Sequence, residues 1–258
     1  MDAVEQLLEI YRKNPCRTLP NAFWKTAVAL NPACLEIEID ATQRLESLAV
    51  WKGDQLLAYW CAKLEKCGLS ERQISQVPFA LVHNDAVHLF TKRAFRTKKP
   101  YFRLHQQGEL APYDLPRRYR FETVQPEVDL KDVAGLIPAC YQDIQISEEI
   151  VKSWMTHPVY APDLWIWIVE NRSGKCVALG IAEYDPSVPE ASLEWVQVLP
   201  GYQQQGLGSA LVVELLQRIP NQAAFTTVAG ENDNPHDPEG LYRKCGFSGK
   251  DRWWLLAE

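Results

Sequence analysis

Residues 195–216 constrain the fold of this chain more than any other stretch. The stretch opens with a run of β-favouring residues that ends at Pro200, which predicts a strand. From Leu207 to Leu215 apolar residues recur at helical spacing, which predicts a helix. A short loop with two glycines joins the two elements. A strand, a tight turn and a helix in this order are typical of an α/β protein.

The loop itself reads Gln-Gln-Gln-Gly-Leu-Gly over residues 203–208. Two glycines at the start of a helix let the backbone come close to a ligand, because no Cβ stands in the way. The first amides of that helix have no internal partner and lie at the positive end of its dipole. Such a turn suits a pyrophosphate. The alternative is that the glycines only tighten the connection between strand and helix.

Two sequence blocks give the chain a family resemblance. Gln203-x-x-Gly206-x-Gly208, entered from Val-Gln-Val-Leu-Pro, resembles the acyl-CoA-binding motif of the GNAT superfamily of N-acetyltransferases. Downstream, Asn234 followed by Leu-Tyr-Arg-Lys-Cys-Gly-Phe at 241–247 is similar to a second block of that family. The resemblance covers roughly residues 118–258. It implies an α/β (α+β) fold with a mixed, mostly antiparallel central sheet flanked by helices.

The resemblance also implies a site for acetyl-CoA as cosubstrate. The positions that match the family's cofactor-binding residues are Val196, Gln197, Val198, Gln203, Gln204, Gln205, Gly206, Leu207, Gly208, Ser209 and Asn234. Gln204 and Gln205 stand where family members often carry Arg or Lys, so the phosphate site would depend on amides and the helix dipole. The spacing from Asn234 to Tyr242 is one residue longer than usual.

Acetyl transfer to an amine needs a base for the amine and an acid for the leaving thiolate. Tyr242 matches the family's acid, and a phenol with an ordinary pKa of ~10 is protonated at neutral pH. The expected base is Glu194, because the two-residue period of a strand places it on one face with Val196 and Val198. Glu183 is the reserve candidate. The structural alternatives are a packed Tyr242 and a Glu194 that points to solvent.

Composition excludes several other classes of function. The net charge is −6, and the one short basic cluster, at residues 92–99, is typical of a solvated face rather than of a nucleic-acid site. The seven cysteines include no Cys-x-x-Cys pair, which favours reduced thiols in the cytoplasm. No apolar run approaches the ~20 residues of a membrane-spanning helix. No metal-ligand spacing occurs, so no metal is expected.

Residues 108–116 hold a glycine, two prolines and an aspartate, which predicts a linker. We therefore expect a smaller mixed α/β domain at 1–115 and a GNAT-like catalytic domain at 116–258. The first domain would select the substrate or be a degenerate repeat of the same fold. In the second, patterning predicts the order β-α-α-β-β-β-α-β-α-β, with Asp129 as a helix cap and 164–169 as a central strand.

In the N-terminal half, patterning predicts helices at 2–13, 22–30 and 70–76 and strands at 35–40, 47–51, 55–61, 87–95 and 101–107. The last two are expected to pair around Lys98-Lys99-Pro100. The aromatic residues Trp165, Trp167, Trp195, Trp253 and Trp254 are expected in the core.

The sequence thus predicts an enzyme that moves an acetyl group from acetyl-CoA directly to a primary amine. The acceptor is a small-molecule or peptide amine, with no nucleic-acid or membrane partner, and the oligomeric state stays open. The rival interpretation is a non-catalytic sensor that binds acyl-CoA. A dinucleotide site is disfavoured, because the third glycine and the acidic residue ~20 positions on are absent.

Overall fold

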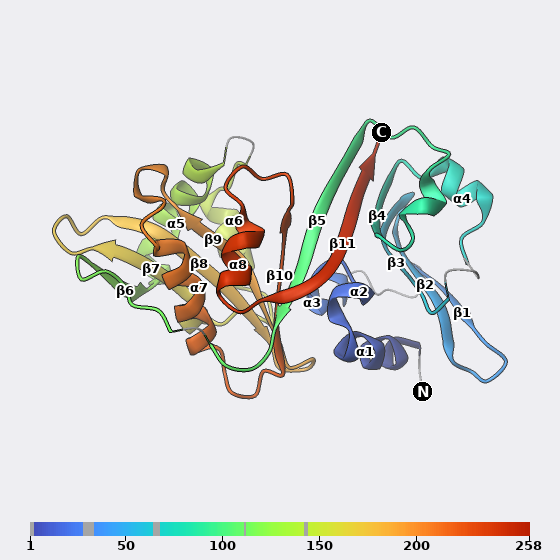
Figure 1. The fold of residues 1–258 in the computed structure, drawn as a ribbon, viewed down its shortest axis with the longest axis horizontal. Helices are drawn as coiled ribbons and strands as arrows, with labels where there is room; N and C mark the ends of the chain where they lie inside the picture. The colour runs from blue at the N-terminus through green and yellow to red at the C-terminus, as the bar shows by residue number, and fades with distance from the viewer. Residues whose placement is uncertain (1–2, 28–33, 64–67, 111, 142–143) are drawn as a thin grey trace. The chain divides into compact units, whose positions relative to one another are not determined.

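The structure, a computed structural model, describes residues 3–27, 34–63, 68–110, 112–141 and 144–258 (Figure 1). The chain forms two compact units. The first unit comprises 1–105, 227–239 and 248–258, and the second comprises 106–226 and 240–247. The chain therefore passes between the units several times, whereas the sequence predicted a single crossing near residue 116.

In its described residues, the first unit contains four α-helices and a mixed sheet. Its helices are α1 (Ala3–Lys13), α2 (Pro15–Thr18), α3 (Phe23–Ala27) and α4 (Glu71–Gln76). Its strands are β1 (Leu35–Ile39), β2 (Leu45–Lys52), β3 (Gln55–Cys61), β4 (Phe79–His83), most of β5 (Thr97–Gln106), and β11 (Ser248–Ala257). The capping box that starts α4 is readable from the sequence, since Ser70 and Gln73 exchange hydrogen bonds at 2.8 and 3.3 Å.

The C-terminal strand of the chain lies inside the sheet of the first unit. The strand order there is β1-β2-β3-β4-β11-β5, and β11 pairs antiparallel with both β4 and β5. Strands β3 and β4 run parallel, with α4 between them in the chain, while the β1–β2 and β2–β3 pairs are antiparallel. The sheet of the first unit is therefore completed by β11, which begins almost 150 residues after the end of β5.

The predicted strand pair at 87–95 and 101–107 is wrong. Val87–Phe90 form a 3-10 helix, and β5 runs without a break through Lys98-Lys99-Pro100. Proline has no N–H to donate to a neighbouring strand, but its carbonyl can still accept a hydrogen bond. The carbonyl of Pro100 accepts one from Asn232 N at 2.9 Å. Strand β4 was not predicted. The predicted helix at 22–30 is observed over Phe23–Ala27, and its last part lies outside the described residues.

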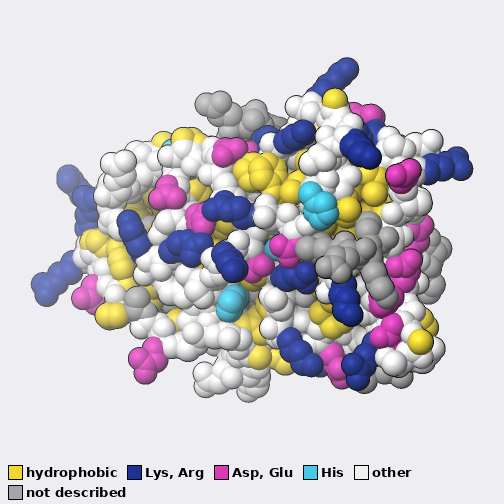
Figure 2. Space-filling model, turned by 45° about the vertical axis from the view of Figure 1, so that its right-hand side comes forward, with side chains coloured by type: hydrophobic (Ala, Val, Ile, Leu, Met, Phe, Trp, Pro, Cys, Tyr) yellow, Lys and Arg dark blue, Asp and Glu magenta, His cyan; other side chains and the backbone are white. Residues whose placement is uncertain are grey.

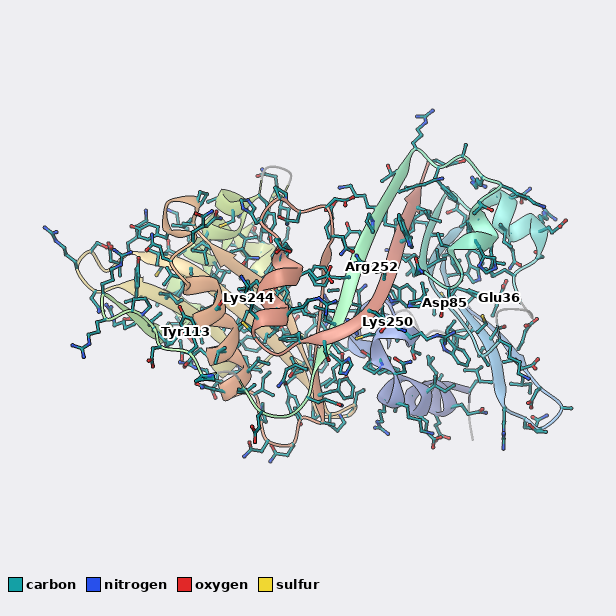
Figure 3. The ribbon with its side chains drawn as sticks, in the orientation of Figure 1. Glu36, Asp85, Tyr113, Lys244, Lys250 and Arg252 are labelled. Atoms are coloured by element: carbon teal, nitrogen blue, oxygen red, sulfur yellow. The ribbon has the colours of Figure 1, made fainter. Side chains whose placement is uncertain are left out.

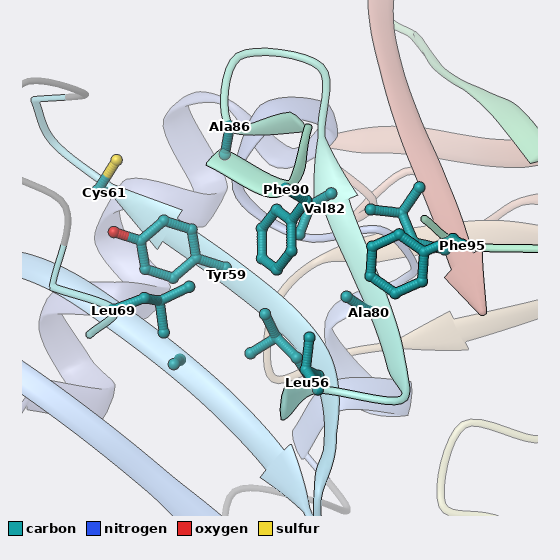
Figure 4. Packing of buried hydrophobic residues seen from close by; sticks show 12 residues of the cluster. Leu56, Tyr59, Cys61, Leu69, Ala80, Val82, Ala86, Phe90 and Phe95 are labelled. Atoms are coloured by element: carbon teal, nitrogen blue, oxygen red, sulfur yellow. The ribbon is translucent and has the colours of Figure 1, made fainter. Parts of the chain in front are cut away.

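One apolar cluster fills the space between β2, β3, β4 and α4 (Figure 4). Leu56, Ala80 and Val82 are fully buried in it, and Phe90 and Phe95 close one side. Trp51 and Ile74 are partly buried against its edge. This cluster gives the first unit a core of its own, which the burial of so much aliphatic and aromatic surface stabilises.

The second unit shows the predicted order of elements. It runs β6 (Tyr119–Thr123), α5 (Pro126–Cys140), α6 (Glu148–Trp154), β7 (Trp165–Glu170), β8 (Cys176–Asp185), β9 (Glu190–Val198), α7 (Leu207–Arg218), β10 (Phe225–Glu231), α8 (Pro238–Lys244) and then β11. The residues of β10, α8 and β11 are divided between the two units. The strands β6 to β9 lie in the order β9-β8-β7-β6, and each neighbouring pair is antiparallel. The fold class is confirmed.

Helices cover both faces of this sheet. On one face, α5 and α6 bury Trp165 and Trp167, as predicted for a central strand. On the other face α7 packs so closely on β8 that a Cβ at Gly180 would lie 2.9 Å from Leu211 and Leu215. Asp129 is not the cap of α5, which starts after Gln125; its carboxylate instead accepts hydrogen bonds from Gln125 N and Trp167 Nε1.

The surface and the cysteines agree with the composition. Lys and Arg side chains are interspersed with Asp and Glu over the visible face (Figure 2). The cysteines that the structure describes are free thiols: Cys16, Cys34, Cys61, Cys140, Cys176 and Cys245. Among the described residues, no helix has the length and apolar character that crossing a bilayer requires.

Candidate functional site

The glycine-bearing turn joins β9 to α7 through an irregular backbone. After the 3-10 turn Pro200–Tyr202, Gln204 takes φ +58° and Gly206, the N-cap of α7, takes φ +81°. A left-handed residue at a helix start favours glycine, because a Cβ is strained there. The turn therefore has the unusual backbone that the two glycines predicted.

The first amides of α7 have no hydrogen-bond partner among the described residues. Within the part of the chain that the structure describes, the amides of Leu207, Gly208 and Ser209 donate no hydrogen bond, and the first bonded amide is that of Ala210, which donates to Gly206 O at 3.0 Å. Unpaired amides at the positive end of a helix are the kind of donors that bind anions in proteins. This turn fits a diphosphate.

Side chains near the turn form hydrogen bonds to its carbonyl and side-chain oxygens, and none of these bonds uses the first amides of α7. Tyr113 Oη, labelled in Figure 3, donates to Gly206 O at 2.6 Å. Gln203 Nε2 donates to Val198 O at 3.1 Å, and Gln205 Oε1 accepts from Tyr119 Oη at 2.8 Å. Two of the three glutamines therefore stabilise the turn, rather than standing in for a phosphate-binding cation.

The positive charge that the loop sequence lacks comes from elsewhere in the chain. The Arg118 guanidinium donates to Gln205 Oε1 and lies 4.8 Å from the ring centre of Tyr119. Lys175 Nζ lies 5.4 Å from the ring centre of Tyr202. Sequence reasoning missed both cations, because nothing in their local sequence shows that the fold brings them to the turn.

Replacing Gly206 with alanine is expected to weaken CoA binding by about tenfold to a hundredfold, because a left-handed alanine costs roughly 1–2 kcal/mol and a clash adds to it. The new Cβ would lie 2.3 Å from Tyr113 Oη. The turn can relieve both problems only by moving its amides. Calorimetric titration with CoA measures the effect.

The control for this substitution is Gly201→Ala, since a Cβ at Gly201 meets nothing within 4 Å. It should leave CoA affinity unchanged. Adding Tyr113→Phe to Gly206→Ala removes the clashing oxygen, so the double variant should recover part of the affinity. Equal affinity in Gly206→Ala and wild type would contradict the assignment of this turn.

Replacing Arg118 with glutamine is expected to weaken CoA binding by about two- to fivefold, the size of an exposed charge interaction. The salt dependence of affinity should also become shallower, because exposed charges are screened. Arg120→Gln is the matched control, since Arg120 pairs with Glu122 and Asn171 instead. A loss in Arg120→Gln as large as that in Arg118→Gln would refute a specific role.

Tyr242 is a buried phenol on α8. It is 8% exposed, and its ring meets Phe247 edge-on at 5.6 Å. Burial raises the pKa of Tyr242 well above its usual range, and the neighbouring groups Tyr141, Cys245 and Glu194 raise it further. The side chain is therefore protonated throughout the neutral range, as a proton donor must be.

Glu194 lies close enough to Tyr242 to raise the pKa of the phenol. The β8–β9 register shifts between the pairs Ile181–Trp195 and Ala182–Leu193, so Glu194 occupies a β-bulge. Bulges re-aim a side chain and are frequent beside active sites. Ser192 Oγ donates to Glu194 Oε1 at 2.7 Å, which orients the carboxylate.

Glu183, the reserve candidate for the base, has different neighbours. Glu183 is 5% exposed, pairs in register with Ser192, and raises the pKa of Tyr160. Glu194 therefore remains the better placed carboxylate for partnership with Tyr242.

The remaining predicted cofactor residues are placed as follows. Val196 and Val198 pair with Gly180 and Ala178 of β8. The Gln197 side chain is 4% exposed, and its Nε2 donates to Tyr141 Oη at 3.4 Å. Asn234 belongs to the first unit, where its Oδ1 accepts from His236 N at 2.9 Å. Cofactor binding by these residues stays a prediction.

No metal site accompanies this geometry: nowhere in the described ranges are three or more His, Cys, Asp or Glu side chains grouped to hold an ion.

One family model matches the C-terminal part of the chain. The family model of the acetyltransferase (GNAT) domain matches residues 162–249, which include the turn and Tyr242. No curated protein matches the chain in sequence.

Solved structures show where the fold recurs. A GCN5-related N-acetyltransferase from Sphaerobacter thermophilus is 16% identical with a TM-score of 0.67, over 85% of this chain and 78% of that one. A GNAT-family acetyltransferase from Colwellia psychrerythraea is 14% identical with a TM-score of 0.65, over 99% and 97%. A Drosophila protein is 14% identical with a TM-score of 0.58, over 100% and 97%.

The matched domain, the open amides of the turn and the buried phenol on α8 all lie in the part of the chain where the sequence blocks occur. The C-terminal part of this chain therefore holds a region, residues 162–249, that matches the acetyltransferase (GNAT) domain, and the chain shares its fold with solved GNAT structures.

Proposed function

We propose that this protein transfers an acetyl group from acetyl-CoA directly to a primary amine. The observation that carries the proposal is the set of open amides on Leu207, Gly208 and Ser209 at the start of α7. Such donors favour a diphosphate, which acetyl-CoA carries. The GNAT domain supports acetyl as the group that is moved.

In this proposal Glu194 and Tyr242 carry the catalytic roles. Glu194, or a water that it orders, takes the proton of the amine, whose nitrogen then attacks the thioester carbonyl carbon. The carbon–sulfur bond breaks as the tetrahedral intermediate collapses. Tyr242 gives its proton to the leaving sulfur and is later reprotonated by solvent or by the proton on Glu194. No covalent intermediate on the protein is required.

The acceptor is a small-molecule or peptide amine. The net charge of −6 supports a cationic acceptor, because a negative field raises the local concentration of cations. The free cysteines support a reducing, cytoplasmic setting. A nucleic-acid or membrane partner is not part of the proposal.

The test measures the release of free thiol from acetyl-CoA with a panel of primary amines. Thiol release that depends on the amine, together with a mass increase of one acetyl group on the amine, supports the proposal. A protein that binds CoA in calorimetry but acetylates no amine would instead be an acyl-CoA sensor. Turnover that passes through an acetylated protein would contradict direct transfer.

A further inference from the structure

We propose that the first unit carries a second binding site, for a small organic cation, in the cavity beside α4. The cavity has a volume of about 350 Å³ and opens to solvent. That volume lies at the lower end of the range for small-molecule pockets, about 300–1,000 Å³. Every described residue that lines it belongs to the first unit.

Three elements build the wall of this cavity. The strand β1 provides Glu36, the strand β2 and the turn after it provide Trp51 and Asp54, and α4 provides Gln73 and Gln76. Figure 3 labels Glu36, on the strand β1. Trp51 pairs with Leu56 in the β2–β3 ladder, directly after a register shift between Val50 and Trp51. The wall is therefore held by a sheet and a capped helix.

The charges of the wall have one sign. Glu36 and Asp54 are both carboxylates, and none of the described lining residues is a Lys, Arg or His. Within the described residues neither carboxylate takes part in an ion pair. Gln73 Nε2 donates to Glu36 Oε2 at 2.6 Å, which holds that carboxylate at the cavity. Two unneutralised carboxylates in one hollow attract a cation.

The aromatic wall distinguishes an organic cation from a metal ion. Trp51 is partly buried against the apolar cluster of Figure 4, and it also lines the cavity. An indole face attracts alkylammonium and guanidinium groups more strongly than any other side-chain ring. Two carboxylates also fall short of the three ligating side chains that mark a metal site. The wall therefore selects a ligand with a cationic head and an apolar body.

This site is independent of the proposed acetyl transfer. Its residues come from β1, the β2–β3 hairpin and α4, whereas Tyr242, Glu194 and the turn belong to the second unit. A ligand that has no N–H group can therefore probe it without being a candidate amine acceptor.

The experiment compares choline with 3,3-dimethylbutan-1-ol, which has the same shape without the charge. Ligand-observed NMR titration of the full chain, in the absence of acetyl-CoA, measures both. Choline should bind about tenfold more tightly than the neutral alcohol, since two carboxylates and the indole act only on the charge. The same titration of Tyr242→Phe should give the same affinities, which separates this site from the proposed catalytic one.

Three variants locate the site. Glu36→Gln and Asp54→Asn should each weaken choline binding about two- to fivefold, and Trp51→Phe should weaken it by a similar factor. Glu9→Gln removes the same charge from the exposed side of α1 and should have no effect. All of these side chains except Trp51 are exposed, so the folded state should persist.

The proposal is overturned by any of three results. These are no binding of choline at millimolar concentrations, equal binding of choline and the neutral alcohol, and a loss in Glu9→Gln as large as that in Asp54→Asn. The last result would mean that choline responds only to the overall charge of the protein.

Discussion

Replacing Tyr242 with phenylalanine is expected to lower kcat for acetyl transfer by about 10²–10⁴-fold, the usual contribution of a positioned general acid. The dissociation constant for acetyl-CoA should stay close to that of wild type, because the substitution removes one oxygen and leaves the packed ring. Thiol release with the best amine of the panel, together with a CoA titration, measures both quantities.

The pH profile gives a second readout of the same group. Burial is the main cause that raises the pKa of Tyr242, so the acid stays protonated beyond the ordinary phenol value of ~10. The rate should therefore show no alkaline fall from this group near that pH. By linkage, a raised folded-state pKa stabilises the protein fully below the ordinary value, and this contribution is lost as pH rises above it.

A matched control is Tyr59→Phe, which removes a buried phenol oxygen from the first unit. It should leave kcat near the wild-type value. If Tyr242→Phe retained full kcat, another group would have to protonate the sulfur. If it lost CoA affinity as much as kcat, the hydroxyl would be a binding group and not an acid.

Replacing Trp253 with alanine is expected to lower the free energy of unfolding by about 3–5 kcal/mol, the range for a buried Trp or Phe. Trp253 is 1% exposed, in the strand β11 that pairs with both β4 and β5. Its Nε1 donates to Cys16 O at 2.8 Å, and its ring meets His83 edge-on at 5.5 Å. The substitution leaves a cavity and removes the partner of a buried carbonyl, and both effects destabilise.

Chemical denaturation followed by circular dichroism measures this loss. The control is Trp254→Ala, one residue along the same strand, where the side chain is only partly buried. It should cost clearly less. Equal losses would mean that β11 contributes mainly through its backbone pairs and that Trp253 is not a central core residue.

Local signals predicted much of the second unit. The apolar run of β7, which the sequence predicted as a central strand, is buried on both faces. This feature is decided by residues within a few positions of one another. The same holds for the glycine turn, where a positive φ at Gly206 follows from the lack of a Cβ.

Long-range pairing is what the sequence could not show. Strand β5 carries a proline and three basic residues, so its pattern resembles an exposed turn more than a strand. It forms because β11 pairs along it from Thr97 to His105. Strand β4 was missed for a similar reason: its partners are β3 and β11, and one of them lies about 170 residues away.

Local sequence also predicted one part of the candidate site and missed another. The turn and Tyr242 lie in blocks that can be read locally. Tyr113, Arg118 and Tyr119 reach the turn from 93, 87 and 86 residues away, so no window of sequence contains both partners. The side chains of Gln203 and Gln205 were predicted as cofactor residues, and their observed contacts are with the protein itself.

Calorimetric titration of the full chain with CoA tests the central claim most directly. Open amides at the start of α7 predict saturable binding in wild type and in Gly201→Ala, with much weaker binding in Gly206→Ala. No heat of binding in the wild type, or the same affinity in all three proteins, would contradict the claim that this turn holds the diphosphate of an acetyl carrier.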